Sequence, residues 1–170
     1  KKLFIWLLYL IAPLVSIAQE STQYPTDYLS PAFHAGRRAA FREKLSANGV
    51  GIFFASQVRV RNNDVDYQYA QSKNFYYFTG LEESDAMLLL FKQPVTILNK
   101  TGTEFIFVKN RDPQKELWTG KILGVEGVKA RYKMENVFTN DQFTASTIDF
   151  TTIDSVFSAY RNEGIFSKYK

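Results

Sequence analysis

The sequence predicts an α/β fold in which a mixed β-sheet is flanked by α-helices, as a single domain after an N-terminal signal peptide. Short, continuously apolar runs such as residues 50–55 are typical of strands buried on both faces. Segments with helical spacing lie between these runs, as expected when helices cover a sheet. The 15 Phe and 10 Tyr among 170 residues favour strands and a large core.

The N-terminus has the pattern of a secretory signal peptide. Lys1 and Lys2 precede an apolar stretch over residues 3–15, and the small residues Ser16 and Ala18 follow. A transmembrane span needs roughly 20 apolar residues, so a signal peptide cleaved after Ala18 is favoured over a stable membrane anchor. We therefore expect a secreted or periplasmic protein.

Cleavage would divide the chain into three parts and change its charge. The expected parts are a signal peptide at residues 1–18, a linker at residues 19–30 and a domain at residues 31–170. The whole-chain charge of +4 includes the two N-terminal lysines, so the mature domain would carry only +2. Such a small charge gives no support to a nucleic-acid partner. The chain has no cysteine, so packing must stabilise it without disulfides.

The first expected helix follows the linker. Ser30 is a typical N-cap, Pro31 suits the first helical position, and Asn48-Gly49 is expected to end the helix. The helical spacing places on the buried side Phe33, Phe41 and Leu45. On the solvated side it places His34, Arg37, Arg38, Arg42, Glu43 and Lys44.

The remaining elements are expected in alternation. Predicted strands cover residues 50–55, 75–79, 86–91, 104–108 and 156–157. In the strand at 75–79, Phe75, Tyr77 and Thr79 would lie on one face, and Gly80 would supply a positive φ at the following turn. Residues 57–71 are expected to form a long polar connection, and residues 99–102 a turn. Predicted helices cover residues 112–118, 125–132 and, more weakly, 141–150.

The residues needed for hydrolysis are mostly lacking. His34 is the only histidine, and no nucleophile-elbow or phosphate-loop motif is present. Cysteine-based zinc sites are excluded, and one histidine cannot build a histidine-based site. The carboxylates of the polar connection and of residues 82–85 match no calcium-loop spacing, so solvated turns are the favoured interpretation. We expect no catalytic residue and no metal site in this chain.

Two motif blocks resemble a known family. The first block contains Arg61, Asp64, Tyr67, Tyr69, Gln71, Phe75, Tyr77, Phe78, Thr79, Gly80 and Glu83. The second contains Arg111, Asp112, Pro113, Glu116, Trp118, Gly120, Leu123 and Gly124. In this order and spacing they resemble the N-terminal domain of the aminopeptidase P and prolidase family, which has the creatinase/aminopeptidase P N-terminal fold. Ala70, Leu81 and Ser84 depart from the family pattern, and Ala70 replaces an arginine.

The resemblance implies a function for the parent enzyme. Such enzymes remove the N-terminal residue ahead of a proline, using two divalent metals, usually manganese, in a separate C-terminal catalytic domain. It implies that this chain is an assembly and substrate-gating domain, inactive alone, whose partners are its own catalytic domain, other copies in a homo-oligomer and Xaa-Pro peptides.

The role of Trp118 and the type of parent enzyme stay open at this stage. The resemblance suggests that Trp118 reaches a neighbouring subunit's substrate cleft, whereas local packing is the alternative use of such a large aromatic side chain. A prolidase-type dipeptidase half and a stand-alone, non-catalytic interaction domain are the alternative functions.

Overall fold

The computed structural model describes residues 29–146 and 148–158. The predicted signal peptide and most of the predicted linker lie outside these residues. In chain order the elements are α2 (Pro31–Glu43), β1 (Gly49–Phe54), β2 (Val60–Asn62), β3 (Val65–Asp66), α3 (Lys73–Thr79), β4 (Met87–Ile97), β5 (Lys100–Val108), α4 (Pro113–Thr119), α5 (Gly124–Tyr132), β6 (Val137–Thr139), α6 (Asn140–Ala145) and β7 (Ser155–Ser158).

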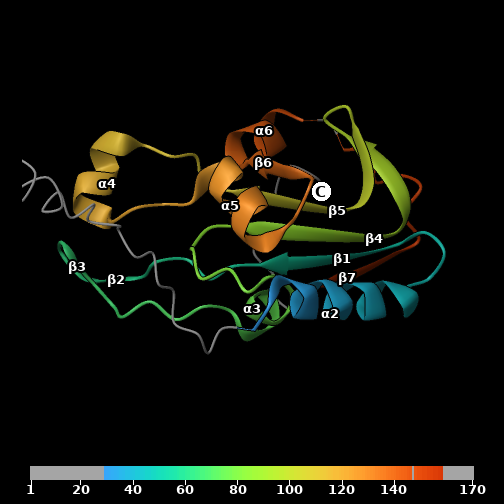
Figure 1. Cartoon of the computed structure of the whole chain (residues 1–170), viewed down its shortest axis with the longest axis horizontal. Helices are drawn as coiled ribbons and strands as arrows, with labels where there is room; N and C mark the ends of the chain where they lie inside the picture. Colours follow the sequence, from blue (N-terminus) through green and yellow to red (C-terminus); the bar gives the residue numbers. More distant parts are fainter. Residues whose placement is uncertain (1–28, 147, 159–170) are drawn as a thin grey trace, which may run out of the picture.

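A five-stranded mixed sheet forms the centre of the fold, which confirms the predicted class. Its order is β6-β5-β4-β1-β7. The pairs β1–β4 and β4–β5 are antiparallel, whereas β5–β6 and β1–β7 are parallel. In Figure 1 the strands lie side by side, while α4 and the β2–β3 hairpin extend to the left, away from the sheet.

Side chains from the central strands alternate between two apolar clusters, one on each face of the sheet. On β4, Leu88 and Leu90 belong to one cluster, whereas Met87 and Leu89 belong to the other. The first cluster also takes in α3, α5 and Phe41 of α2, and the second takes in α6 and the segment after it. Both faces of the sheet are therefore covered, as the apolar runs predicted.

Several predicted boundaries are confirmed or shifted. Ser30 accepts a hydrogen bond from the N–H of Phe33 at the start of α2, and the strand at residues 50–55 is β1. The predicted strands at 86–91 and 104–108 are longer, and a two-residue turn at Leu98 and Asn99, both with positive φ, joins them. Helix α2 ends at Glu43 rather than at Asn48-Gly49, since Gly49 already belongs to β1.

The strand predicted at residues 75–79 is wrong, because these residues belong to helix α3. Ser72 caps its start, and Gly80, with φ 71°, ends it in the left-handed conformation. Phe75, Phe78 and Thr79 point into the fold at helical spacing, whereas Tyr77 is exposed. Phe75, Tyr77 and Thr79 therefore do not share a face. The positive φ predicted for Gly80 is confirmed, although it ends a helix rather than a strand.

Two residues of α2 that were predicted to be solvated are instead buried. His34 is only 2% exposed and Arg38 only 3%. Nδ1 of His34 bonds the carbonyl of Tyr77 at 2.9 Å, and Nη1 of Arg38 donates to the carbonyl of Phe78 at 2.8 Å. These polar side chains satisfy carbonyls at the end of α3 that have no partner within their own helix, which explains their burial.

Glu104 of β5 balances the buried charge of Arg38. Nε of Arg38 lies 2.7 Å from the Glu104 carboxylate, and Arg42 also pairs with Glu104. Burial lowers the pKa of Arg38 to about 10. Helix α2 is thus joined to both α3 and the sheet by polar bonds as well as by packing.

Candidate functional site

Helix α4 sits on an arm that leaves the sheet after β5 and returns before α5. Asp112 accepts hydrogen bonds from the N–H groups of Gln114 and Lys115 (3.1 and 3.3 Å), and Pro113 occupies the first turn. Gly120 ends the helix at φ 84°. This confirms the helix start predicted at Asp112-Pro113. None of the helix's residues is buried.

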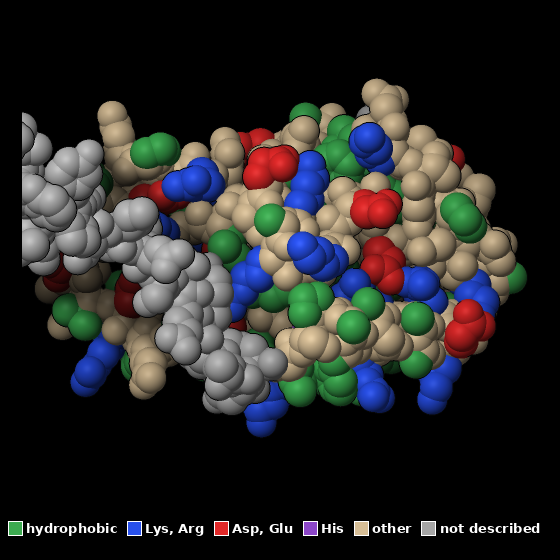
Figure 2. Space-filling view, in the orientation of Figure 1, with side chains coloured by type: hydrophobic (Ala, Val, Ile, Leu, Met, Phe, Trp, Pro, Cys, Tyr) green, Lys and Arg blue, Asp and Glu red, His purple; other side chains and the backbone are tan. Residues whose placement is uncertain are grey.

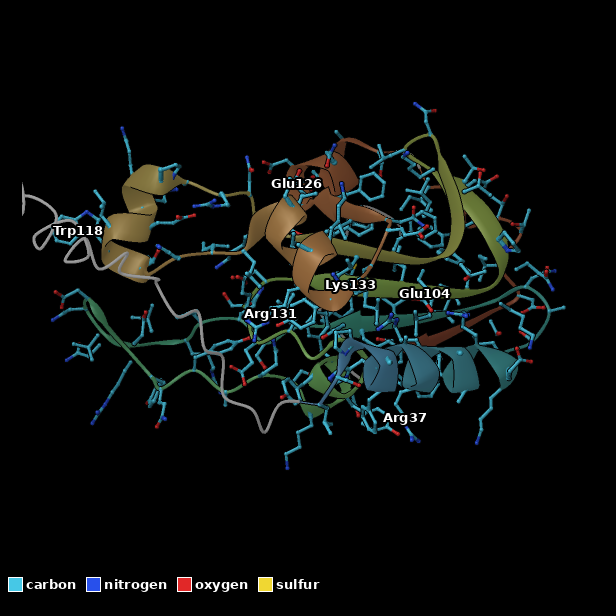
Figure 3. The ribbon with its side chains drawn as sticks, viewed as in Figure 1. Arg37, Glu104, Trp118, Glu126, Arg131 and Lys133 are labelled. Atoms are coloured by element: carbon cyan, nitrogen blue, oxygen red, sulfur yellow. The ribbon has the colours of Figure 1, made fainter. Side chains whose placement is uncertain are left out.

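Two large apolar side chains on α4 face solvent. Trp118 is 90% exposed and Leu117 is 81% exposed. Figure 3 shows Trp118 on the arm, far from the labelled residues of the main body. Among the described residues, local packing therefore does not account for Trp118. An exposed tryptophan beside an exposed leucine is typical of an interaction surface.

Within the arm, one ion pair joins the outgoing segment to α4. Nε and Nη2 of Arg111 donate to the two carboxylate oxygens of Glu116, each at 2.8 Å. This two-pronged bond lowers the pKa of Glu116. Arg111 also packs against Gly124, where a Cβ would lie 2.6 Å from Cγ of Arg111 and where φ is +60°. Gly124 therefore lets the two ends of the arm approach each other closely.

The loop formed by residues 81–85 holds both ends of the arm. On the returning side, the N–H of Leu123 donates to Oε1 of Glu83 at 2.6 Å. On the outgoing side, Nζ of Lys109 lies 2.6 Å from the Asp85 carboxylate and donates to Oγ of Ser84 at 2.8 Å. We call residues 81–85 the clamp loop.

Gln71 fixes the clamp loop to the body of the domain. Its Nε2 donates to the carbonyls of Leu81 and Glu83 (3.1 and 2.9 Å), and its Oε1 accepts from the N–H of Ser56 at 2.8 Å. The hydroxyl of Tyr69 also donates to the Ser56 carbonyl. Burial, followed by nearby carboxylates, raises the pKa of Tyr69 to about 12.

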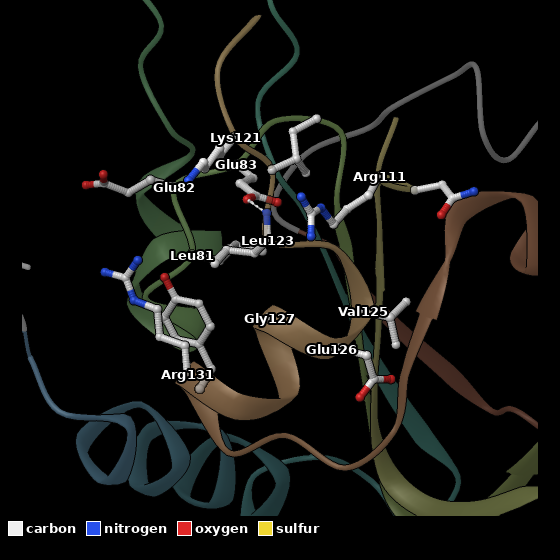
Figure 4. Close-up of a pocket in the computed structure, with 13 residues that line it drawn as sticks. Leu81, Glu82, Glu83, Arg111, Lys121, Leu123, Val125, Glu126, Gly127 and Arg131 are labelled. Atoms are coloured by element: carbon white, nitrogen blue, oxygen red, sulfur yellow. Dashed lines mark hydrogen bonds between the residues drawn. The ribbon is translucent and has the colours of Figure 1, made fainter. Parts of the chain in front are cut away.

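A pocket of about 880 Å³ lies between the clamp loop, the base of the arm and α5. Figure 4 shows the Glu83–Leu123 hydrogen bond in this pocket, with Arg111 and Arg131 nearby. Burial raises the pKa of Glu83, while the Leu123 bond and the charges of Lys109 and Arg131 act in the opposite direction. The other lining residues include Glu82, Asn110, Lys121, Ile122, Val125, Glu126 and Tyr132.

The predicted motif residues fall into three places. On or beside the exposed β2–β3 hairpin lie Arg61, Asp64 and Tyr67. Around α3 and the clamp loop lie Tyr69, Gln71, Phe75, Tyr77, Thr79, Gly80 and Glu83. On the arm lie Arg111, Asp112, Trp118 and Gly120. The arm and the clamp loop meet, so the two motif blocks come together at the arm's base.

Sequence reasoning missed Lys109 and Asp85, which also hold this base, and the buried Arg38–Glu104 pair. A charged residue directly after the apolar run at residues 105–108 is the only sequence signal for Lys109. No sequence signal joins Arg38 to Glu104, since the partners are 66 positions apart.

Surface charge, helix length and the grouping of possible metal ligands limit the kinds of site that the described residues can form. In Figure 2 positive and negative side chains are interspersed over the visible face. Across residues 29–146 and 148–158, no helix is both long and apolar enough to cross a bilayer. The same residues contain no group of three or more His, Asp or Glu side chains that could hold a metal ion.

Comparison with known families decides the assignment. The sequence model described as "Aminopeptidase P, N-terminal domain" matches residues 34–155. The chain belongs to this family. The match includes both motif blocks and the whole sheet up to the start of β7.

Individual members of the aminopeptidase P family support the assignment. The chain is 31% identical over 107 residues to the Xaa-Pro aminopeptidase of Haemophilus influenzae, an alignment that covers 63% of this chain and 24% of that protein. It is 34% identical over 88 residues to the Escherichia coli enzyme, covering 52% of this chain and 19% of that protein. The chain thus spans about a quarter or less of these relatives.

Solved structures show the same fold. Aminopeptidase PepP of Pseudomonas aeruginosa matches with a TM-score of 0.69 and 26% identity, over 82% of this chain and 31% of that one. A zinc-substituted E. coli aminopeptidase P in complex with product matches with a TM-score of 0.60 and 25% identity, over 69% and 26% of the two chains. That E. coli enzyme is therefore one that accepts a metal.

Proposed function

We propose that this chain is the assembly and substrate-gating domain of an exported Xaa-Pro metallo-aminopeptidase, which removes the N-terminal residue ahead of proline. Family membership and the structural likeness to aminopeptidase P support the proposal. The observation that carries the gating role is the exposure of Trp118 on an arm that buries none of its helical residues.

In this proposal the arm supplies binding and not bond cleavage. A separate catalytic domain would hold two divalent metal ions, which we propose are manganese. These ions would activate water and polarise the scissile carbonyl. Trp118 and Leu117 would line the substrate cleft of a neighbouring subunit in a homo-oligomer. The flat indole suits the apolar ring of a proline and excludes water from the cleft.

The test replaces the indole in the complete enzyme. Trp118→Ala is expected to lower kcat/KM on an Xaa-Pro tripeptide about tenfold or more. An aromatic side chain that becomes buried at an interface contributes strongly to the binding free energy. Trp118→Phe should recover part of that loss. Tyr77→Ala, which removes a half-exposed ring on α3, serves as the control. An unchanged kcat/KM for Trp118→Ala would overturn the gating role.

Two further measurements test the rest of the proposal. The isolated 170-residue chain should release no N-terminal residue from an Xaa-Pro peptide with or without manganese, and release would contradict it. We also propose export, supported by the signal-peptide pattern at residues 1–18. Mass spectrometry of the mature protein should find Gln19 at its N-terminus, and retention of residues 1–18 would refute the cleavage.

A further inference from the structure

We propose that Glu83 is a positioning residue: its carboxylate sets the pose of the arm and thereby the place of Trp118. This inference rests on the gating role proposed above. Glu83 is 35 positions before Trp118 and would act through the base of the arm rather than by touching substrate.

The pose of the arm has to be set at its base. No residue of α4 is buried, and its apolar side chains Leu117 and Trp118 face solvent. Packing against the sheet therefore does not orient α4. The Arg111–Glu116 pair ties the helix to its own outgoing segment, so the remaining freedom lies where the arm joins the domain.

Glu83 controls the returning side of that base. Its bond to the N–H of Leu123, at 2.6 Å, joins positions 40 residues apart and falls immediately before α5 begins. Lys109 makes the corresponding contacts to Ser84 and Asp85 on the outgoing side. One short loop therefore grips both ends of the arm, and the separation of those ends determines where α4 points.

The backbone that carries this carboxylate is held in place. Gln71 binds the backbone carbonyl of Glu83 and the N–H of Ser56, two residues after β1 ends, which couples the clamp loop to the sheet. Because the backbone of Glu83 is already fixed, only its side-chain rotamers lose freedom when the carboxylate binds the Leu123 N–H, which favours the bond.

The burial of the Glu83 carboxylate also indicates that its charge has a specific role. Oε2 of Glu83 is buried with no hydrogen-bond donor among the described residues. Charged groups that act on the carboxylate are Lys109 after β5, Arg131 of α5 and Glu116 of α4. Burying a carboxylate is unfavourable, so a group serving only to fill space would be better apolar. The bond to Leu123 is what the carboxylate provides.

The first test is amide hydrogen exchange on the 170-residue chain. Glu83→Ala should speed exchange in residues 110–123 about tenfold or more, the effect of losing a hydrogen bond to a charged group. Strands β1, β4 and β5 should keep their protection. Glu83→Gln keeps an oxygen acceptor and should restore slow exchange in the arm. Glu126→Ala, at the exposed rim of the same pocket, should change neither region.

A second variant removes the donor in place of the acceptor. Leu123→Pro deletes the N–H, and the φ of −66° at Leu123 already suits proline. It should reproduce the faster exchange of the arm, and it keeps the proposal testable if Glu83→Ala fails to fold. Unchanged arm exchange in a folded Glu83→Ala or Leu123→Pro protein would overturn the proposal.

The complete enzyme tests whether Glu83 acts through Trp118. Glu83→Ala should lower kcat/KM for an Xaa-Pro tripeptide, mainly by raising KM, and should have no further effect in a Trp118→Ala background. Equal losses in both backgrounds would overturn the positioning role. If Trp118→Ala alone leaves kcat/KM unchanged, the gating function is wrong. Faster amide exchange confined to the arm in Glu83→Ala would still establish that Glu83 positions the arm.

Discussion

Arg38 shows how one buried cation can join three elements. It extends from α2, bonds the carbonyl of Phe78 at the end of α3 and pairs with Glu104 of β5. The guanidinium group can serve both partners at once because its donors form a planar fork. Its neighbour Arg37 is exposed and lies over the ring of Phe33 instead.

Removing Arg38 should therefore destabilise the fold strongly. Arg38→Ala is expected to lower the free energy of unfolding by about 3–5 kcal/mol, since it leaves the Glu104 carboxylate and a buried carbonyl short of a partner. Arg37→Ala should change it by less than about 0.5 kcal/mol. Urea unfolding followed by circular dichroism measures both, and equal effects would show that the buried pair is not stabilising.

Glu83 makes stability depend on pH in the unusual direction for a carboxylate. Burial raises its pKa in the folded protein, so between the ordinary and the raised pKa the folded state binds more protons than the unfolded state. The contribution of Glu83 to the free energy of unfolding thus rises as pH falls through that window. Glu83→Gln should remove this contribution.

The measurement compares unfolding of the wild-type and Glu83→Gln proteins between pH 4 and pH 7. Their difference in free energy should change with pH in the stated direction. Asp154 offers a control, because the Ser46 hydroxyl lowers its pKa further below the usual aspartate range. Its contribution is lost only at pH values below the range measured, so it should stay nearly constant between pH 4 and pH 7. A pH-independent difference for Glu83→Gln would contradict the burial effect.

At the scale of elements, α3 and α4 are both seven-residue helices with opposite relations to the core. Helix α3 buries Phe75 and Phe78, whereas α4 buries no residue. Each has a side-chain N-cap, Ser72 for α3 and Asp112 for α4. The same kind of substitution should therefore have different consequences in the two helices.

Ser72→Ala should lower the global free energy of unfolding by about 1 kcal/mol, the usual effect of losing an N-cap. Asp112→Ala should leave global unfolding almost unchanged, because α4 can fray without exposing core. It should instead speed amide exchange at residues 114–119. Thermal unfolding and hydrogen exchange distinguish the two, and a large global loss for Asp112→Ala would show that α4 packs more than its exposure indicates.

The sequence predicted the sheet better than the helices beside it. Residues 50–55 and 105–108 are buried on both faces, so an apolar run was a sufficient signal for a strand. Residues 75–78 are all aromatic, and the same rule failed there. The cap at Ser72 and the glycine at position 80 were the local signals that distinguished a helix.

The predicted site was only partly readable for a different reason. The cap at Asp112 follows from local pattern, whereas the sequence left the exposure of Trp118 open. The grip of the clamp loop on Lys109 and Leu123 joins positions about 25 and 40 residues apart. Such pairs depend on how the strands are ordered in space, and hydrophobic periodicity carries no information about that order.

At the scale of the whole molecule, β7 forms one edge of the sheet and pairs with β1. Its Phe157 is 51% exposed, yet its ring lies 5.4 Å from Phe41 of α2 and 6.0 Å from Phe53 of β1. This contact joins the last described strand to α2 and β1, beside the pairing of Val50 with Val156.

Phe157→Ala should lower the free energy of unfolding by roughly 1–3 kcal/mol, about half the loss for a fully buried phenylalanine. Val156→Ala, on the same strand but more exposed and without ring contacts of this kind, should cost less. Thermal unfolding of the two variants tests the difference. Equal losses would mean that strand pairing alone, and not the aromatic contact, holds β7 against β1.

The solvent-facing helix of the arm has a practical consequence. Because folding makes no demand on the side chains at positions 114, 117 and 118, a library randomised there should yield soluble protein at nearly constant levels. Selection from such a library would report recognition alone, free of the losses in abundance that usually obscure it.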